Sequence, residues 1–122
     1  YYKAVNGQVN DLFYYYREQA ALKARQYQRA LDDIVKAVEL SPKDLTYRAE
    51  HAVVNLRVGR YEESMKILNE ILKDEPKYGE AYRLLGLCQI QLKKTDEACG
   101  NFNKAKELGD PNVDELIKKY CK

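Results

Sequence analysis

The side chains that could perform chemistry in this sequence are few and widely spaced. His51 is the only histidine, and no HExxH or ExxH pattern surrounds it, so it lacks partners at metal-ligand spacing. The two serines, Ser41 at a helix boundary and Ser64 on a predicted packing face, do not have the setting of an activated nucleophile. No glycine-rich phosphate loop is present. The sequence therefore predicts no enzyme, no cofactor and no metal site, and we expect His51 to be a packed or hydrogen-bonded residue.

Three cysteines, Cys88, Cys99 and Cys121, are the remaining reactive groups. The absence of a CxxC pattern argues against a redox motif or a zinc site. In one interpretation all three are small buried hydrophobic residues, which is where free cysteine usually lies. In the other, a disulfide forms within the last part of the chain, which would imply an oxidising compartment. The sequence does not otherwise indicate a compartment.

The composition is typical of helices with a well-solvated surface, and neither positive nor negative charge is in large excess. Charged residues make up 33% of the chain and the formal net charge is +2. This balance gives no electrostatic argument for nucleic acid or an anionic membrane. The longest apolar candidate, Leu84 to Leu92, has nine residues, far fewer than the ~20 that a membrane helix needs. Because the chain begins at Tyr1, we expect it to be a fragment or a processed product of a longer protein.

The elements that must position any site are amphipathic helices that recur every 34 residues. Two columns at this spacing are an apolar one, Ile34, Leu68 and Phe102, and a small one, Ala30, Ser64 and Ala98. The clearest copy runs from Tyr78 to Pro111 and contains two helical patterns joined by a polar turn. A small residue, Gly86, stands where two antiparallel helices must approach closely. We expect seven helices and no strand.

This copy resembles the tetratricopeptide repeat through Tyr82, Leu85-Gly86, Ala98, Phe102, Ala105 and Pro111. The resemblance implies an all-α fold, a right-handed α-solenoid of three helix-turn-helix hairpins with a C-terminal capping helix. The expected boundaries are an N-terminal arm or linker at 1–10, repeats at 11–44, 45–78 and 79–112, and a cap at 113–122. The first repeat departs from the pattern because Arg17 and Glu18 replace the Leu-Gly pair. We expect them to satisfy each other or the upstream segment.

The resemblance also implies that the chain binds another protein on a concave groove. By register, the predicted groove residues are Tyr15, Tyr16, Gln19, Lys23, Ala49, Glu50, Val53, Arg57, Arg83, Leu84, Leu87, Ile90 and Gln91. Relatives that bind chaperone C-termini carry a Lys/Asn/Arg carboxylate clamp here. The matching places in this chain hold Tyr15, Gln19, Glu50, Glu80 and Leu84, so we expect no clamp and no chaperone binding of that kind. The groove favours an amphipathic helix or an extended peptide with hydrophobic anchors.

Several alternatives remain open at this stage. Leu84, Leu87 and Ile90 could be covered by the protein's own neighbours or by a second copy. A structural self-assembly module is therefore the alternative to a partner-binding scaffold, and a homo-oligomer is possible. A pentatricopeptide-like RNA reader would need a basic groove, which Leu84, Leu87 and Glu50 argue against. The resemblance also suggests a bacterial source.

Overall fold

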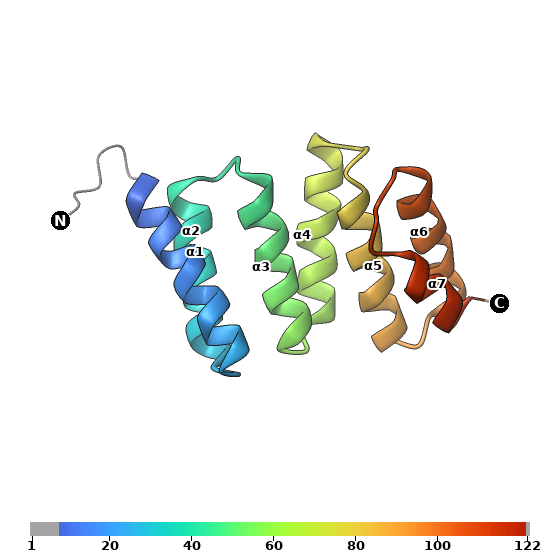
Figure 1. Ribbon diagram of the computed structural model, residues 1–122, viewed down its shortest axis with the longest axis horizontal. Helices are drawn as coiled ribbons and strands as arrows, with labels where there is room; N and C mark the ends of the chain where they lie inside the picture. Colours follow the sequence, from blue (N-terminus) through green and yellow to red (C-terminus); the bar gives the residue numbers. More distant parts are fainter. Residues whose placement is uncertain (1–7, 122) are drawn as a thin grey trace. The chain divides into compact units, whose positions relative to one another are not determined.

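The computed structural model describes residues 8–121, with side chains from residue 11, as an all-α protein (Figure 1). Within these residues there are seven helices and no strand, as the sequence predicts. The helices are α1 (Gln8–Lys23), α2 (Tyr27–Leu40), α3 (Leu45–Arg57), α4 (Tyr61–Asp74), α5 (Gly79–Gln91), α6 (Thr95–Glu107) and α7 (Asp114–Tyr120). Helix α1 begins at Gln8, so residues 8–10 belong to this helix and not to the predicted arm. The remainder of the predicted arm, residues 1–7, lies outside the described residues.

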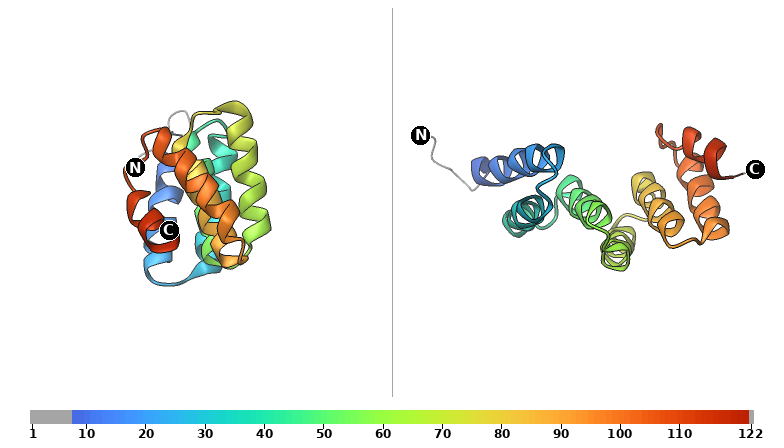
Figure 2. Two further views of the ribbon diagram at one scale, coloured as in Figure 1. Left: turned by 90° about the vertical axis from the view of Figure 1, so that its right-hand side faces the viewer. Right: turned by 90° about the horizontal axis from the view of Figure 1, so that it is seen from below.

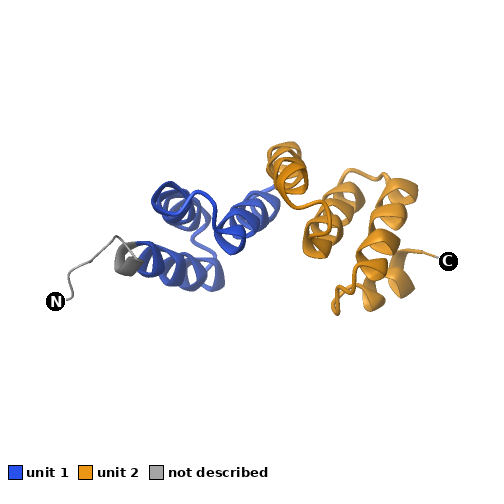
Figure 3. Ribbon diagram, turned by 90° about the horizontal axis from the view of Figure 1, so that it is seen from above, with its two compact units in different colours: residues 1–59 blue, residues 60–122 orange. Residues whose placement is uncertain are grey.

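The chain divides into two compact units, residues 1–59 with α1 to α3 and residues 60–122 with α4 to α7 (Figure 3). The division falls at Gly59, inside the predicted second repeat. Gly59 has a φ of +89°, the left-handed conformation expected for the residue that closes α3. The predicted repeat boundaries remain predictions, and each unit is described separately below.

In the first unit, α2 lies between α1 and α3 and packs against both. The apolar spacing of α2 puts Ala30, Ile34 and Ala37 on its buried stripe, where all three are completely inaccessible. Tyr47 and Val54 of α3 complete this core, and Tyr14, Tyr15 and Leu22 of α1 pack against it. The small side chains on α2 allow the two neighbouring helices to approach it closely.

In the second unit, α4 packs on α5, α5 on α6, and α6 on α7, and Figure 2 shows α7 lying along α6. The core contains Ala98, Phe102, Ala105 and Val113, all completely buried. Leu116, Ile117 and Tyr120 come from α7 or its edge and pack on this cluster. Helix α7 therefore covers the apolar side of α6.

A disulfide between Cys99 and Cys121, with Cα atoms 5.7 Å apart, ties the end of α7 to α6. The interpretation that all three cysteines are free is therefore wrong for this pair. It holds for Cys88, which is free and buried. Burial raises the pKa of the Cys88 thiol, and a hydrogen bond with Ser64 of α4 acts in the opposite direction.

Helices α6 and α7 begin without a side-chain cap. Thr95 is the first helical residue of α6, and Lys94 precedes it. Asp110 lies before Val113, the residue that precedes α7. The Asp110 carboxylate instead accepts a hydrogen bond from the Asn112 backbone N–H at 2.9 Å. It therefore stabilises the turn that leads into α7.

Candidate functional site

The first unit carries a pocket of about 470 Å³ at the C-terminal ends of α1 and α3. Its lining residues are Gln19, Leu22, Lys23, Arg25, Tyr27, Glu50 and Arg57. Four of them are predicted groove residues, because Gln19, Lys23, Glu50 and Arg57 were placed together by the repeat register. Leu22, Arg25 and Tyr27 were not predicted. They lie in or beside the α1–α2 turn. The repeat register predicts which residues share a helix face, but it does not predict the positions of side chains in turns.

Three exposed cations surround this pocket. Lys23 and Arg57 lie in the last turns of α1 and α3, where the helix dipole favours positive charge. Arg25 follows α1 in the left-handed conformation, with a φ of 59°. Within residues 11–121, none of the three forms an ion pair or a side-chain hydrogen bond. Against a single carboxylate, Glu50, the pocket therefore has an excess of positive charge that a bound group can neutralise.

The carboxyl group of Glu18 lies beneath this region and is completely buried. Neither of its oxygens has a hydrogen-bond partner among the described residues. Burial first, and then the proximity of the Glu50 and Asp33 carboxylates, raise the pKa of Glu18 to about 9. We infer that Glu18 is protonated at neutral pH.

Arg17 does not satisfy Glu18, so the expectation that the two residues satisfy each other is wrong, and the upstream segment lies outside the residues whose side chains are described. The guanidinium of Arg17 instead binds the Asp33 carboxylate of α2, with Nε 3.0 Å and a terminal nitrogen 2.9 Å from its two oxygens. Asp33 is almost completely buried, so this bidentate pair ties α1 to α2. The sequence placed Arg17 beside Glu18 along the chain, but the partner of Arg17 comes from the facing helix.

The predicted aromatic groove residues have different environments. Tyr15 packs on the core, with its ring centroid 5.2 Å from that of Tyr47. Burial first and the charge of Glu50 second raise the pKa of Tyr15, whereas a hydrogen bond with Gln19 lowers it. Tyr16 is 62% exposed on the outer side of α1, and Val53 is half-buried. Tyr15 and Gln19 therefore adjoin the pocket, whereas Tyr16 extends away from the core.

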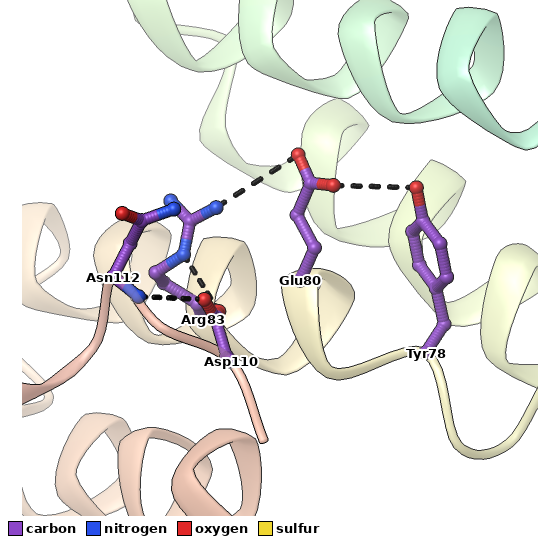
Figure 4. Close-up of polar contacts among 5 residues, drawn as sticks. All are labelled: Tyr78, Glu80, Arg83, Asp110 and Asn112. Atoms are coloured by element: carbon purple, nitrogen blue, oxygen red, sulfur yellow. Dashed lines mark hydrogen bonds and ion pairs between the residues drawn. The ribbon is translucent and has the colours of Figure 1, made fainter. Parts of the chain in front are cut away.

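In the second unit, the predicted groove residue Arg83 is occupied by an intramolecular contact (Figure 4). Its Nε lies 2.7 Å from an Asp110 carboxylate oxygen, and a terminal nitrogen lies 3.8 Å from Glu80. The same Glu80 accepts a hydrogen bond from the Tyr78 hydroxyl at 3.2 Å. Arg83 thus connects α5 to the turn before α7, and it is not free to orient a partner.

The apolar groove residues of α5 are largely covered by the protein itself. Leu84 is 4% exposed, and Leu87 and Ile90 are half-buried against the core of α6 and α7. Leu87, predicted to line an open groove, instead packs against the inter-helix core. Leu84 is covered by neighbouring parts of the same protein, which is one of the alternatives that the sequence left open. Ala49 of α3 is likewise buried, whereas Gln91 is exposed and accepts a hydrogen bond from the Tyr61 hydroxyl at 3.5 Å.

Among the described residues, no group of three His, Cys, Asp or Glu side chains lies close enough to hold a metal ion. The backbone carbonyl of His51 accepts a hydrogen bond from the Asn55 side chain at 3.1 Å. No described helix combines the length and apolar character needed to cross a membrane.

Comparison with known proteins adds an independent observation. The model of the tetratricopeptide repeat family matches residues 21–87 and 55–100. The chain is 29% identical over 99 residues to a small glutamine-rich tetratricopeptide repeat-containing protein 2 of Mycosarcoma maydis, covering 81% of this chain and 28% of that protein. It is 31% identical over 101 residues to the heat shock protein STI1 of Saccharomyces cerevisiae, covering 80% and 17%. The chain therefore spans less than a third of these relatives.

Solved structures agree on the fold. The first tetratricopeptide domain of Spaghetti (RPAP3), bound to the HSP90 peptide SRMEEVD, superimposes with a TM-score of 0.77 at 20% identity, covering 90% of this chain and 89% of that one. The corresponding domain of Sgt2 from Aspergillus fumigatus gives a TM-score of 0.78 at 20% identity, covering 90% and 73%. The two sequence relatives named above are fungal, so they give no support to the expected bacterial source.

Proposed function

The chain belongs to the tetratricopeptide repeat family, and we propose that it is a non-catalytic scaffold that binds a peptide or helix of a partner protein. We further propose that the pocket of the first unit anchors an acidic residue of that partner. The observation that carries this proposal is the set of three unpaired cations, Lys23, Arg25 and Arg57, around a pocket of about 470 Å³.

The chemistry of the pocket suits an acidic residue next to an apolar one. Lys23 and Arg57 supply charge-assisted hydrogen bonds to a carboxylate, and Leu22 and Tyr27 supply apolar contact. Glu50 is the one acid in the lining, against three cations. A peptide carrying alternating acidic and apolar side chains is thus favoured over a basic one.

This mode of binding differs from the carboxylate clamp. The RPAP3 domain is bound to the acidic peptide SRMEEVD in its structure. In this chain the clamp-matching places are Tyr15, Gln19, Glu50, Glu80 and Leu84. None of them is a cation, and Leu84 is buried. We therefore expect weak or no binding of SRMEEVD, with the acidic anchor moved to the helix ends that carry Lys23 and Arg57.

Selection from a random peptide library against the immobilised chain tests the proposal. We expect the recovered peptides to be enriched in Asp or Glu beside Leu, Phe or Tyr, and to lose at least tenfold in affinity toward Lys23→Glu/Arg57→Glu. A matched control, Lys36→Glu/Lys43→Glu, changes the net charge equally on exposed positions outside the pocket lining. Equal binding to both double variants would reject the anchor, and failure to recover any peptide would reject the scaffold function in this form.

A further inference from the structure

The charges in the pocket of the first unit are unequally distributed along the two helices that form it. On α3, Glu50 precedes Arg57 by two turns, so the two residues are about 10 Å apart along the helix axis. On α1, Gln19 precedes Lys23 by one turn. Helices α1 and α3 end on the same side of the first unit (Figure 1). The pocket therefore has a polar end, formed by Gln19 and Glu50, and a cationic end at the last turns of both helices.

The α1–α2 turn adds a third cation, Arg25, at the cationic end. The carbonyl oxygens of Ala20, Ala21 and Leu22, in the last turn of α1, accept hydrogen bonds of 2.8–3.0 Å from the backbone N–H groups of residues 24–26. These hydrogen bonds reduce the partial negative charge that a helix end otherwise presents. The helix end beneath the three cations therefore offers them few free acceptors.

The acidic groups next to the pocket do not cancel this positive charge. Asp33 is held by Arg17 through two contacts of 2.9 and 3.0 Å. Glu18 is completely buried and its pKa is raised to about 9, so it is uncharged at neutral pH. Glu50 is the single carboxylate in the lining, and it lies at the polar end. The lining thus carries two more positive than negative charges.

A phosphoryl group matches this arrangement better than a carboxylate does. A phosphorylated side chain carries about −1.5 to −2 charges at pH 7 and has three acceptor oxygens, whereas Asp or Glu carries one charge on two oxygens. The guanidinium groups of Arg25 and Arg57 are planar forks that bind phosphate through two parallel hydrogen bonds, and Lys23 adds a compact positive charge. The pocket volume of about 470 Å³ also accommodates a group larger than a carboxylate.

We propose that the pocket of the first unit binds a phosphorylated side chain of the partner protein, with the phosphoryl group between Lys23, Arg25 and Arg57. Leu22 and Tyr27 contact the carbon atoms that carry the phosphate. This inference rests on the proposed function, because it specifies which acidic residue the pocket anchors. The phosphodiester backbone of a nucleic acid matches less well, since each linkage carries one charge and the net charge of the chain is only +2.

Fluorescence anisotropy of short labelled peptides with the whole chain tests this inference. The peptides differ at one position, which is flanked by Leu on both sides and holds Glu, Ser, phosphoserine, Tyr or phosphotyrosine. We expect the tighter of the two phosphopeptides to bind at least tenfold more tightly than the Glu peptide, and the Ser and Tyr peptides to bind most weakly. Comparing phosphoserine with phosphotyrosine shows which side chain carries the phosphate. Binding should weaken in high salt.

Variants of the chain locate the binding site. Arg25→Gln/Arg57→Gln should weaken binding of the phosphopeptide at least tenfold. The matched control, Arg29→Gln/Arg60→Gln, removes the same charge from two exposed arginines outside the lining and should leave the affinity unchanged. Circular dichroism checks that both double variants remain folded. Equal loss of affinity in the two double variants would overturn the inference, because the phosphopeptide would then respond only to net charge.

Three further outcomes separate this inference from the proposed function. Equal affinity for the Glu peptide and the phosphopeptides, with both lost in Lys23→Glu/Arg57→Glu, would overturn the phosphoryl assignment and leave the acidic anchor intact. Absence of binding by the phosphopeptides would also overturn it, while the library selection judges the anchor independently. Displacement of the phosphopeptide by single-stranded RNA at an equal phosphate concentration would overturn it by assigning the pocket to a phosphodiester.

Discussion

Gly86 of α5 lies directly against the ring of Phe102 of α6, so closely that a β-carbon at position 86 would overlap the ring. Phe102 is completely buried, and the ring occupies the space that the missing side chain leaves. The close approach of these two helices therefore depends on both residues. The sequence indicated this relationship, because a small residue on the first helix and a large one on the second occupy matching places in the repeat pattern.

Changing either residue should damage the second unit. Phe102→Ala should lower the free energy of unfolding by about 3–5 kcal/mol, because it leaves a cavity in a closed core. Gly86→Leu should also be severe, since the added side chain overlaps the Phe102 ring and forces the helices apart. Gly100→Ala is the matched control: Gly100 lies in open space on α6, so the change should stabilise by up to about 1 kcal/mol. Chemical denaturation measures all three, and a parent-like Phe102→Ala would show that the assigned core is wrong.

Stability should depend on the protonation of Glu18. Its pKa is raised to about 9 in the folded chain from an ordinary value of 4.5, so the folded state retains a proton that the unfolded state releases. The contribution of this group is fully present below about pH 4.5 and is lost as the pH rises toward about 9. Above that range the ionised Glu18 remains buried beside Glu50.

The variant Glu18→Gln isolates this effect. Glutamine keeps the shape of the side chain but cannot ionise. We expect the parent to lose stability relative to Glu18→Gln between pH 5 and pH 9, by several kcal/mol in the free energy of unfolding. Denaturation curves at four pH values measure the difference. A constant difference across this range would show that Glu18 is ionised at all of these pH values.

The Cys99–Cys121 disulfide should hold α7 on the second unit. The bond closes a segment with a sequence separation of 22, for which chain entropy gives about 3 kcal/mol of stabilisation. Cys121→Ser should lower the melting temperature in non-reducing buffer, and a reductant should lower that of the parent to the same value. The reductant should have no further effect on Cys121→Ser. A parent insensitive to reductant under denaturing preincubation would mean that the bond does not stabilise the fold.

Deleting residues 113–122 tests the cap itself. The deletion removes Val113 from the core and uncovers Phe102 and its neighbours on α6. We expect aggregation that increases with protein concentration, measured by light scattering. A truncated chain that stays monomeric with the melting temperature of the parent would show that α7 is not required to cover this core.

Leu87 should behave as a packing residue. It contacts the α6–α7 core and is only half-buried, so Leu87→Ala should lower the free energy of unfolding by about 1–2 kcal/mol. Leu87→Arg should cost more, and any loss of partner binding in that variant would be confounded by unfolding. Thermal melts of both variants measure this. Melting temperatures equal to that of the parent would show that Leu87 does not contribute to the core and is an exposed groove residue.

Sequence periodicity was enough to predict the helices and the inter-helix core, because both depend on side-chain types at fixed spacing. Ile34, Leu68 and Phe102 all occupy the buried positions that their 34-residue spacing predicts. The site was only partly predictable. The 34-residue repeat register predicted that Gln19, Glu50 and Arg57 lie on the same face of the repeats. It does not determine how deeply neighbouring elements cover a side chain. For that reason the sequence could only leave open whether Leu84 and Leu87 are covered by neighbouring elements, as the structure shows them to be.

Long-range polar partners were also beyond the sequence. Arg83 binds Asp110, and Arg17 binds Asp33, across turns whose geometry has no periodic signal. Arg25 and Tyr27 reach the pocket from such a turn. The Cys99–Cys121 disulfide could not be predicted for the same reason, because its formation depends on where α7 ends. These features arise from three-dimensional proximity between elements, which a pattern along one helix face cannot specify.

The central claim is that the pocket at the ends of α1 and α3 anchors an acidic residue of a partner. Its most direct test is titration of the isotopically labelled chain with the tightest peptide from the library selection, followed by backbone amide chemical shifts. We predict that the largest shifts fall on Gln19, Lys23, Glu50 and Arg57, and that replacing the acidic residue of the peptide by Gln abolishes them. Shifts confined to other residues, or unchanged by that replacement, would contradict the claim.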